Sequence, residues 1–314
     1  HRTSPTNIGL YLLSTLAARD FGYLRTPDAA DRIERTLLTM RGLERHRGHL
    51  LNWYRTDSVS PLFPRYVSTV DSGNLAGCLI ALAQGLREAA RAPQDPARLL
   101  EGLFDTALLA GEALAAARER SPESREALSP LLRAVQSVSE TTASDRPIWE
   151  KRALLLEHRM ELRDRQKALL NHPVFESAAM KDAVGWLRTL DDALPIPERE
   201  PEDLPARLED LASQAESFAD EMDFTFLYDG HRKLMSIGYR LADAEGPGRL
   251  DTTSYDLLAS EARLASFIGI TKGDLPQPHW FALGRQLVNV KGRPTLVSWS
   301  ASMFEYLMPD LLMK

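Results

Sequence analysis

The stretch TPDAADRIERTLLTMRGLE (26–44) decides the expected fold, because it carries the marks of an amphipathic α-helix. Thr26 can cap the helix N-terminus, Pro27 suits the first helical position, and Asp28 places a negative charge in the first turn. Apolar residues then recur at helical spacing: Ile33, Leu37, Met40 and Leu43. The sequence therefore predicts a helix over 27–46 with one buried face.

The same periodicity continues outward from this helix along most of the chain. It predicts further helices over 7–21, 71–91, 97–119, 123–140, 147–170, 174–193, 203–222, 252–271, 276–288 and from about 301 onward. Between them, FTFLYD (224–229) and KLMSIGY (233–239) predict a short β-hairpin, and KGRPTLVSWS (291–300) predicts a turn and a short strand. The expected fold class is all-α with short β-hairpins in loops.

Composition narrows the class of protein. The 314 residues carry 44 acidic and 38 basic side chains, a net charge of −6, which argues against general nucleic-acid binding and against docking on anionic lipid through charge alone. No run of about 18 uncharged apolar residues occurs, so we expect no membrane span. Cys78 is the single cysteine, which excludes an internal disulfide and fits a reducing compartment. Neither a metal-ligand pattern nor a glycine-rich phosphate loop occurs, so we expect no metal and no cofactor.

The two ends of the chain suggest a piece of a longer polypeptide. The sequence opens with HRTSPTNIGLYLL (1–13), without methionine, and closes with the apolar run SMFEYLMPDLLMK (302–314). Natural termini are usually solvated, so an apolar end favours a chain that continues.

Residues 93–200 differ in texture from the rest. They are rich in Ala, Leu, Arg and Glu, and PIPEREPEDLP (195–205) has the composition of a linker. This segment predicts a bundle of helical hairpins. Outside it, paired helices joined by loops dense in aromatic and polar residues suggest an α/α toroid, although a generic helical bundle explains the helices equally well.

Three segments combine aromatic and polar residues in a way that suits carbohydrate. A sugar ring has apolar C–H faces and an equatorial ring of hydroxyls, so its site needs both kinds of side chain. The first segment is NWYRTDSVSPLFPRYVSTVDSGNLAG (52–77). Its candidate residues are Trp53, Tyr54, Arg65, Tyr66, Ser68, Asp71 and Asn74. In the alternative interpretation the aromatic residues are core and Asp71 caps a helix.

The second segment is SYDLLASEARLASFIGI (254–270), where Glu261 falls on the apolar stripe of the predicted helix, between Leu257 and Leu264. Burial disfavours an ionised carboxylate and raises its pKa, as general acid catalysis requires. The alternative is a buried ion pair, with Arg263 or Arg65 as the partner.

The third segment is LVSWSASMFEYLMP (296–309). Trp299 and Tyr306 are candidates for stacking on a sugar ring, and Glu305 for hydrogen bonding to its hydroxyls. An aromatic core helix with one surface glutamate fits the same pattern.

The motifs together resemble the middle, glycoamylase-like region of bacterial cyclic β-1,2-glucan synthases. The resemblance covers residues 1–92 and about 203–314, whereas 93–200 carries no motif of the family. It rests on these stretches: TSPTNIGLYLLSTLAARDFGYL (3–24), ERHRGHLLNWYRTDSVSPLFPRYVSTVDSGNLAGCL (44–79), FLYDGHRKLMSIGY (226–239), SYDLLASEARLASFIGITKGDLPQPHWFALGR (254–285) and VSWSASMFEYLMP (297–309).

The resemblance implies an (α/α)6 barrel that cyclises β-1,2-glucan by retaining transglycosylation. Residues 1–92 would be its first helices, 93–200 an inserted helical bundle, and 201–314 a truncated continuation. The implied partners are β-1,2-glucan and, in the same polypeptide, glycosyltransferase and phosphorylase-like domains. The implied location is a soluble segment on the cytoplasmic side of a bacterial inner-membrane protein.

The resemblance also implies residue roles. Glu261, in SEARL, matches the general acid of related endo-β-1,2-glucanases, and Asp71 matches the aspartate of the VSTVDS-type motif, so these two are the catalytic candidates. Tyr255 and Arg263 join Trp53, Tyr54, Arg65, Tyr66, Ser68, Asn74, Trp299, Glu305 and Tyr306 as substrate-binding candidates.

The sequence departs from the family pattern in three places. The family continues with a GISES-type motif, where we expect the nucleophilic carboxylate, and this chain stops at Lys314, so we expect the fragment alone to be inactive. Cys78 stands where His is more usual, and Ala301 where Gly is more usual. A β-1,2-glucan hydrolase and a non-catalytic glucan-binding or scaffold module stay open as alternatives.

Overall fold

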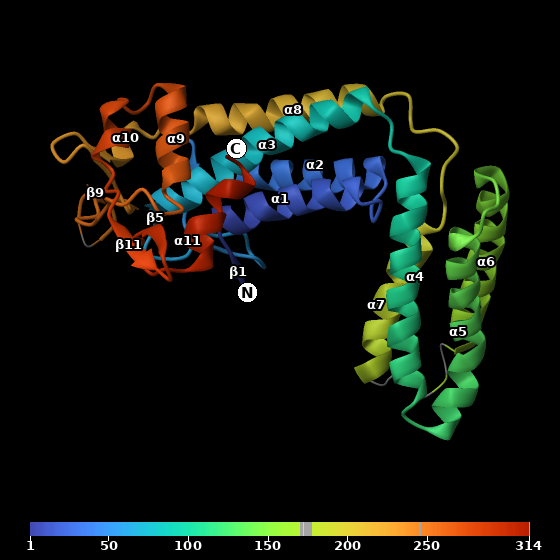
Figure 1. Ribbon diagram of the computed structural model, residues 1–314. Helices are drawn as coiled ribbons and strands as arrows, with labels where there is room; N and C mark the ends of the chain where they lie inside the picture. The colour runs from blue at the N-terminus through green and yellow to red at the C-terminus, as the bar shows by residue number, and fades with distance from the viewer. Residues whose placement is uncertain (170–171, 173–177, 245, 314) are drawn as a thin grey trace. The chain divides into compact units, whose positions relative to one another are not determined.

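The computed structural model describes residues 1–169, 172, 178–244 and 246–313, and it is mainly α-helical, as the sequence predicted. The chain divides into two compact units. The first unit comprises His1–Leu16, Ala30–Ala90 and Pro205–Lys314, and the second comprises Ala17–Ala29 and Arg91–Leu204. The colours in Figure 1 show how the first unit is assembled from both ends of the chain.

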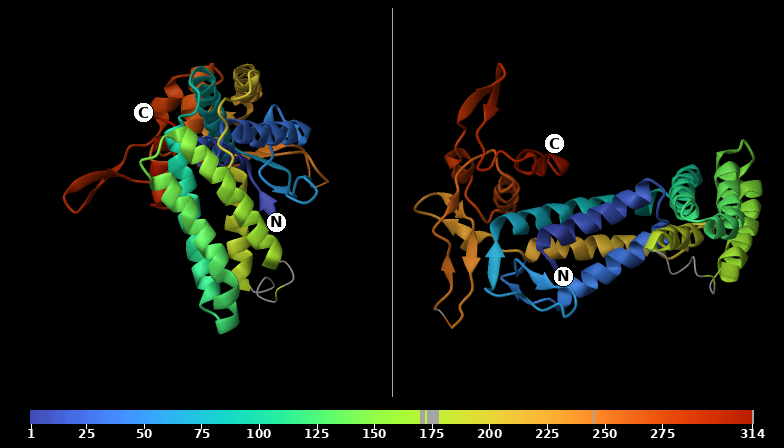
Figure 2. Two further views of the ribbon diagram at one scale, coloured as in Figure 1. Left: turned by 90° about the vertical axis from the view of Figure 1, so that its right-hand side faces the viewer. Right: turned by 90° about the horizontal axis from the view of Figure 1, so that it is seen from below.

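Four long helices form the body of the first unit: α1 (Pro5–Asp20), α2 (Thr26–Gly42), α3 (Thr69–Arg91) and α8 (Leu204–Glu221). They lie side by side in Figures 1 and 2. Helices α1 and α3 approach closely, because a Cβ atom added to Gly9 would lie 2.9 Å from the Cβ atom of Cys78. On the other side, Arg87 of α3 forms an ion pair with Glu216 of α8.

The core of this unit lies between these helices. The predicted apolar face of α2 is buried as expected, since Ile33 and Leu37 are at most 1% exposed. Leu12 from α1 joins them, with further fully buried residues on α3: Leu75, Leu79, Leu82 and Leu86.

Short strands gather near one end of the helices (Figure 1). β1 (Arg2–Thr3) pairs with β4 (Tyr54–Arg55), and β2 (Arg45–His46) pairs with β3 (His49–Leu50). One three-stranded sheet has the order β5 (Tyr66–Ser68), β8 (Gly238–Arg240), β9 (Arg249–Leu250). The other has the order β10 (Ser254–Tyr255), β7 (Leu234–Ser236), β6 (Tyr228–Asp229). All these pairs are antiparallel.

The predicted hairpin around Asp229-Gly230 is confirmed but shorter than expected. Tyr228 lies opposite Met235, and the Asp229 carboxylate accepts hydrogen bonds from two backbone N–H groups of the turn. The preceding residues form the 3₁₀ turn η2 (Thr225–Leu227) instead of a strand. Strand β8 leaves the hairpin and pairs with β5, so it ties the loop after α2 to the second half of the unit.

Two predicted helices are wrong. Residues 252–271 contain a helix only at α9 (Arg263–Lys272), because the preceding Thr, Ser and Tyr residues form strand β10 and a series of turns. Residues 276–288 form only the short helix α10 (Pro278–Ala282) before β11 (Leu287–Val290), which pairs with β12 (Arg293–Leu296). The predicted final helix is limited to α11 (Met303–Leu307) and the 3₁₀ turn η3 (Pro309–Leu311).

The second unit contains α4 (Pro96–Arg118), α5 (Pro122–Ala143), α6 (Ile148–Leu169) and α7 (Ala178–Ala193) (Figure 2). The predicted start of the last helix at 174 lies outside the described residues. Asp95 and Ser121 cap α4 and α5, each followed by proline at the first helical position. Leu103, Leu131 and Leu187 lie in a hydrophobic core of its own.

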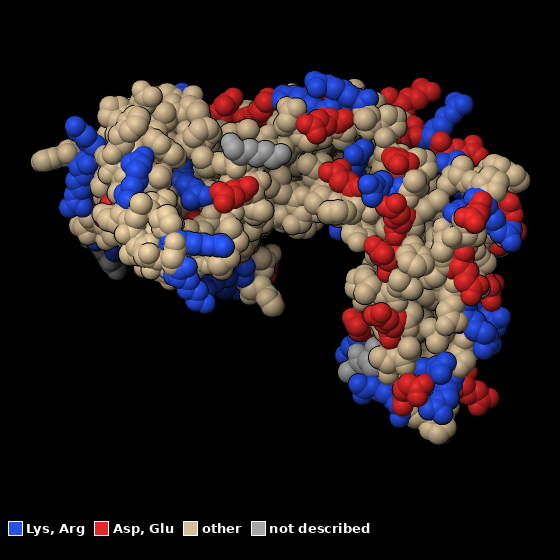
Figure 3. Space-filling model, in the orientation of Figure 1, with Lys and Arg blue, Asp and Glu red and all other residues tan. Residues whose placement is uncertain are grey.

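The surface of the second unit mixes charges of both signs, as Figure 3 shows for one face. Such a surface is typical of solvated helices. In the part of the chain that the structure describes, no helix is both long enough and apolar enough to cross a bilayer.

Candidate functional site

Glu261 lies in the turn that leads into α9, not inside a helix as the sequence predicted. Its carbonyl accepts the N–H of Leu264, and Ala262 is the N-cap of α9. The side chain is half-buried, although it does not lie on the apolar stripe of a helix, which was the reason to expect burial.

Close packing of α3 against α9 brings Glu261 to its neighbours. A Cβ atom added to Gly73 would lie 2.5 Å from the Cβ atom of Ala265, so only glycine lets the two backbones approach this closely. The next residue on α3, Asn74, is 0% exposed, and its Nδ2 atom lies 3.5 Å from Oε2 of Glu261. Two segments 187 residues apart therefore share one site.

A chain of hydrogen bonds links the two predicted catalytic carboxyl groups. Asn74 Nδ2 also donates to Oγ1 of Thr6 (3.2 Å), and that hydroxyl donates to Oδ1 of Asp71 (2.6 Å). The order is thus Glu261, Asn74, Thr6, Asp71. Thr6 stands at the start of α1, and nothing in the sequence marks it as a bridge, because its partners are 65 and 68 residues away.

The environment of Glu261 favours the protonated carboxyl group. Burial raises the pKa of Glu261 to about 7, and the carboxylates of Asp71 and Glu305 act in the same direction, while the Asn74 amide opposes them. Neither arginine suggested as an ion-pair partner fills that role among the described residues. Arg263 pairs with Asp310 (2.6 Å), and Arg65 pairs with Glu44 (2.9 Å).

Asp71 does not cap its own helix. Ser68 does so, since its Oγ atom accepts the N–H of Asp71 (3.3 Å). The Asp71 carboxylate instead reaches the first turn of α1, where Oδ1 accepts the N–H of Thr6 (3.3 Å). With the Asn52 amide oriented to suit its neighbours, its nitrogen donates to Oδ2 of Asp71 (3.0 Å) and its oxygen accepts from Nε1 of Trp53 (3.2 Å).

Tyr255 and Trp299 form an aromatic pair, and Tyr255 is electrostatically coupled to Glu261. Their ring centroids are 5.6 Å apart, and Trp299 is 47% exposed, so its ring is accessible to a ligand. The indole N–H donates to Oδ1 of Asp256 (3.0 Å), which fixes the ring. Burial and the charge of Glu261 raise the pKa of Tyr255.

Glu305 and its neighbours hold the last helix in place. Glu305 is 9% exposed, so it is not a surface residue, and it forms a capping box with Ser302. Burial would raise the pKa of Glu305, but hydrogen bonds from Ser300, Ser302 and Ser298 outweigh it and lower that pKa. Two further candidates support the same segment: the Tyr306 hydroxyl donates to the Leu296 carbonyl, and the Arg263 guanidinium donates to the Tyr306 carbonyl.

Tyr54 cannot serve as a stacking platform for a sugar, which corrects that candidate. Its ring is 1% exposed, and its hydroxyl donates to the Glu44 carbonyl (2.7 Å) while it accepts the N–H of Leu51 (2.6 Å). Trp53 lies under the guanidinium of Arg2, 4.1 Å from its ring centroid. Tyr66 of this first segment contributes to the raised pKa of Tyr255.

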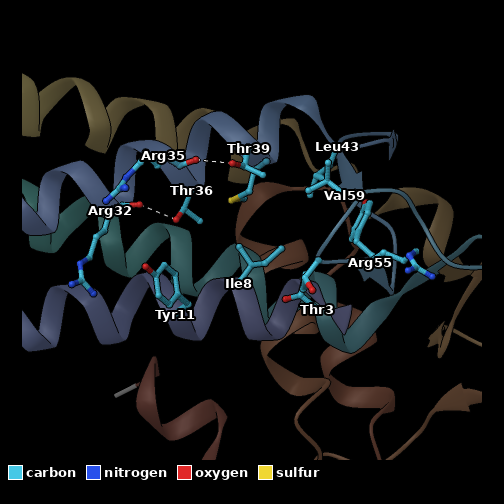
Figure 4. Close-up of a pocket in the computed structure, with 13 residues that line it drawn as sticks. Thr3, Ile8, Tyr11, Arg32, Arg35, Thr36, Thr39, Leu43, Arg55 and Val59 are labelled. Atoms are coloured by element: carbon cyan, nitrogen blue, oxygen red, sulfur yellow. Dashed lines mark hydrogen bonds between the residues drawn. The ribbon is translucent and has the colours of Figure 1, made fainter. Parts of the chain in front are cut away.

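A separate groove runs between α1, α2 and the loop after β4 (Figure 4). Its volume is about 490 Å³, and no Asp or Glu is among the residues that line it. Arg32 and Arg35 lie at one end and Arg55 at the other, around apolar residues such as Ile8 (Figure 4). Of the predicted site residues, only the buried Tyr54 lines this groove.

The described residues thus bring together a half-buried acid, a second carboxylate linked to it through Asn74 and Thr6, and an exposed tryptophan. Within the described residues, no group of three or more His, Cys, Asp or Glu is arranged to hold a metal ion. No family model matches the chain.

A curated relative matches the chain from end to end. It is the cyclic beta-(1,2)-glucan synthase NdvB of Rhizobium meliloti (strain 1021), 42% identical over 330 aligned positions that cover 100% of this chain. The chain spans 11% of that relative's length. The chain is thus similar to one segment of a cyclic β-1,2-glucan synthase, which confirms the resemblance that the motifs indicated.

Proposed function

We propose that this chain is part of a domain that acts on β-1,2-glucan within a cyclic β-1,2-glucan synthase and closes the glucan ring by retaining transglycosylation. The observation that carries the proposal is the Glu261 carboxyl group, which is half-buried, has its pKa raised to about 7 and is electrostatically coupled to Tyr255 of the Tyr255–Trp299 pair. A carboxyl group with such a pKa can donate a proton near neutral pH.

In the proposed mechanism Glu261 protonates the glycosidic oxygen that leaves. A second carboxylate attacks the anomeric carbon and forms a glycosyl-enzyme intermediate, which requires the two carboxyl groups to lie about 5–5.5 Å apart. Glu261, now ionised, then accepts the proton of the 2-hydroxyl at the chain's own non-reducing end, and that oxygen displaces the enzyme carboxylate. The bond that forms closes the ring, and the enzyme returns to its starting state.

We expect the attacking carboxylate to come from another part of the synthase. Both Asp71 and Glu305 already accept hydrogen bonds that hold helix N-termini, on α1 and α11 respectively. A carboxylate engaged in this way is a weak nucleophile, since those bonds stabilise its negative charge. Asp71 is better suited to orient the site through Thr6 and Asn52.

The architecture completes the proposal. The helices of the first unit belong, in this view, to an (α/α)6 barrel into which residues 93–200 are inserted, with 1–92 and 201–314 on either side. The glucan is the substrate, and the glycosyltransferase and phosphorylase-like domains of the same polypeptide are the partners. The segment faces the cytoplasm.

The test uses the intact synthase in membranes, with Glu261→Gln and, as a matched control, Glu88→Gln on the exposed surface of α3. Products from linear β-1,2-glucan are identified by mass spectrometry, since a ring is lighter by one water than a linear chain with the same number of glucose units. We expect the Glu261 variant to lose cyclic product by about 10²-fold or more while the control keeps it. Cyclic product at the wild-type rate in the Glu261 variant would refute the role.

The same experiment separates the alternatives. Short linear oligosaccharides from the wild-type enzyme, lost in the Glu261 variant, identify a hydrolase, in which water takes the place of the sugar hydroxyl. Unchanged products in both variants identify a binding or scaffold module.

A further inference from the structure

The hydrogen-bond chain between Asp71 and Glu261 has a fixed direction. The Thr6 hydroxyl has one proton, and it is directed to Oδ1 of Asp71 at 2.6 Å, the usual distance for a charge-assisted bond to a carboxylate. Toward Asn74, the Thr6 oxygen can therefore only accept. The Asn74 amide must then present its NH₂ group, not its carbonyl oxygen, to Thr6 (3.2 Å).

This orientation determines what Glu261 meets. The same Nδ2 atom faces Oε2 of Glu261 at 3.5 Å, so Asn74 offers a donor to the carboxylate and no acceptor for a carboxyl proton. On the other side of the amide, Oδ1 of Asn74 is buried and has no hydrogen-bond partner among the residues that the structure describes. Buried carbonyl oxygens are usually satisfied, so the amide is held against its own preference by Thr6.

We propose that Thr6 and Asn74 are positioning residues that set the protonation of Glu261. The Asp71 carboxylate fixes the direction of the Thr6 hydroxyl, and that hydroxyl fixes which side of the Asn74 amide faces Glu261. A donor bond to the carboxylate favours its ionised form, and a flipped amide would favour the protonated form. Among the described residues, Glu305 from α11 and Tyr255 from β10 are also coupled to Glu261 electrostatically, and neither is part of this chain of bonds. This inference depends on the proposed function only in the assignment of Glu261 as the general acid.

The test measures the protonation of Glu261 directly. Carboxyl ¹³C NMR titration of the chain, with the Glu261 signal assigned by its loss in Glu261→Gln, gives the pKa without any glucan. Thr6→Val removes the hydroxyl at constant shape and frees the amide to turn, so we expect the pKa of Glu261 to rise by about 0.5 to 1 unit. Thr6→Ser keeps the hydroxyl and should leave the pKa unchanged.

Two further variants guard the interpretation. Thr15→Val is the matched control, because Thr15 is a second threonine of α1, it is buried, and its hydroxyl donates to the Tyr11 carbonyl (2.8 Å) rather than to Asp71. Asn74→Leu removes the donor itself and should raise the pKa even if Thr6→Val does not fold. An unchanged or lowered pKa in the folded Thr6→Val or Asn74→Leu protein overturns the proposal. Unchanged cyclisation in the Glu261→Gln synthase, with the pKa shift of the Thr6 and Asn74 variants intact, would count against the proposed function instead.

Discussion

Glu261 occupies a place that is costly for an ionised carboxylate, and the cost depends on pH. The group is protonated in both the folded and the unfolded chain below its ordinary pKa of 4.5. As the pH rises toward about 7, the unfolded chain loses that proton readily while the folded chain retains it. The contribution of Glu261 to the free energy of unfolding is therefore least favourable at pH values above its raised pKa.

This linkage predicts that Glu261→Gln stabilises the protein at pH 8 and not at pH 4. After allowance for solvent screening of a half-buried group, we expect a gain of about 1 to 2 kcal/mol in the free energy of unfolding at pH 8. Urea denaturation at the two pH values measures it, with Glu88→Gln as control. A gain of equal size at both pH values would show that the pKa of Glu261 is not raised.

At the residue scale, sequence patterns identified the types of side chain but not their contacts. Glu261 and Asn74 were both named in advance, yet their proximity depends on folding across 187 residues. Thr6 could not be found, because a threonine near a helix start usually binds its own helix. Tyr54 was misjudged because an aromatic residue in a polar loop can face either a ligand or the core.

At the element scale, the contact between α3 and α9 is the feature that builds the site. Gly73→Ala would place a methyl group against Ala265, at 2.5 Å from its Cβ atom and 2.7 Å from its Cα atom, so backbone must move. We expect a loss of about 1 to 3 kcal/mol in the free energy of unfolding, and a lower pKa for Glu261 as solvent enters.

Gly185→Ala is the matched control for that change. This glycine lies inside α7, and a Cβ atom there meets nothing within 4 Å, so the substitution should stabilise the protein by up to about 1 kcal/mol. Guanidinium denaturation of the two variants gives the comparison. Equal effects of both substitutions would contradict the close approach of α3 to α9.

Long helices were predictable as elements, and short ones were not. The apolar stripe of α2 and the caps of α4 and α5 are local signals, and the structure follows them to within a few residues. In residues 252–271, however, Glu261 satisfied helical spacing by coincidence, because Leu257 belongs to a turn region before α9. Strand partners that are distant in the chain overrode the local pattern there.

At the scale of the whole molecule, the chain forms two hydrophobic cores, one in each compact unit. The change of composition near residue 93 was visible in advance, and the second unit contains its own buried leucines between α4 and α7. The return of the chain to the first unit was not visible, because strand pairing such as β5 with β8 joins residues about 170 positions apart.

Because Cys78 on α3 packs against Gly9 on α1, the reactivity of its thiol can report unfolding of the first unit. Cys78 is the chain's single thiol, it is 0% exposed, and burial raises its pKa to about 12, so the reactive thiolate is scarce in the folded state. We expect modification by a disulfide reagent at pH 8 to be at least about 10³-fold slower in the folded chain than in urea. A rate within tenfold of the denatured chain would show that α1 separates from α3 readily. The rate at which the Cys78 sulfur is labelled therefore reports how often α1 and α3, the helices that carry Thr6 and Asn74, separate.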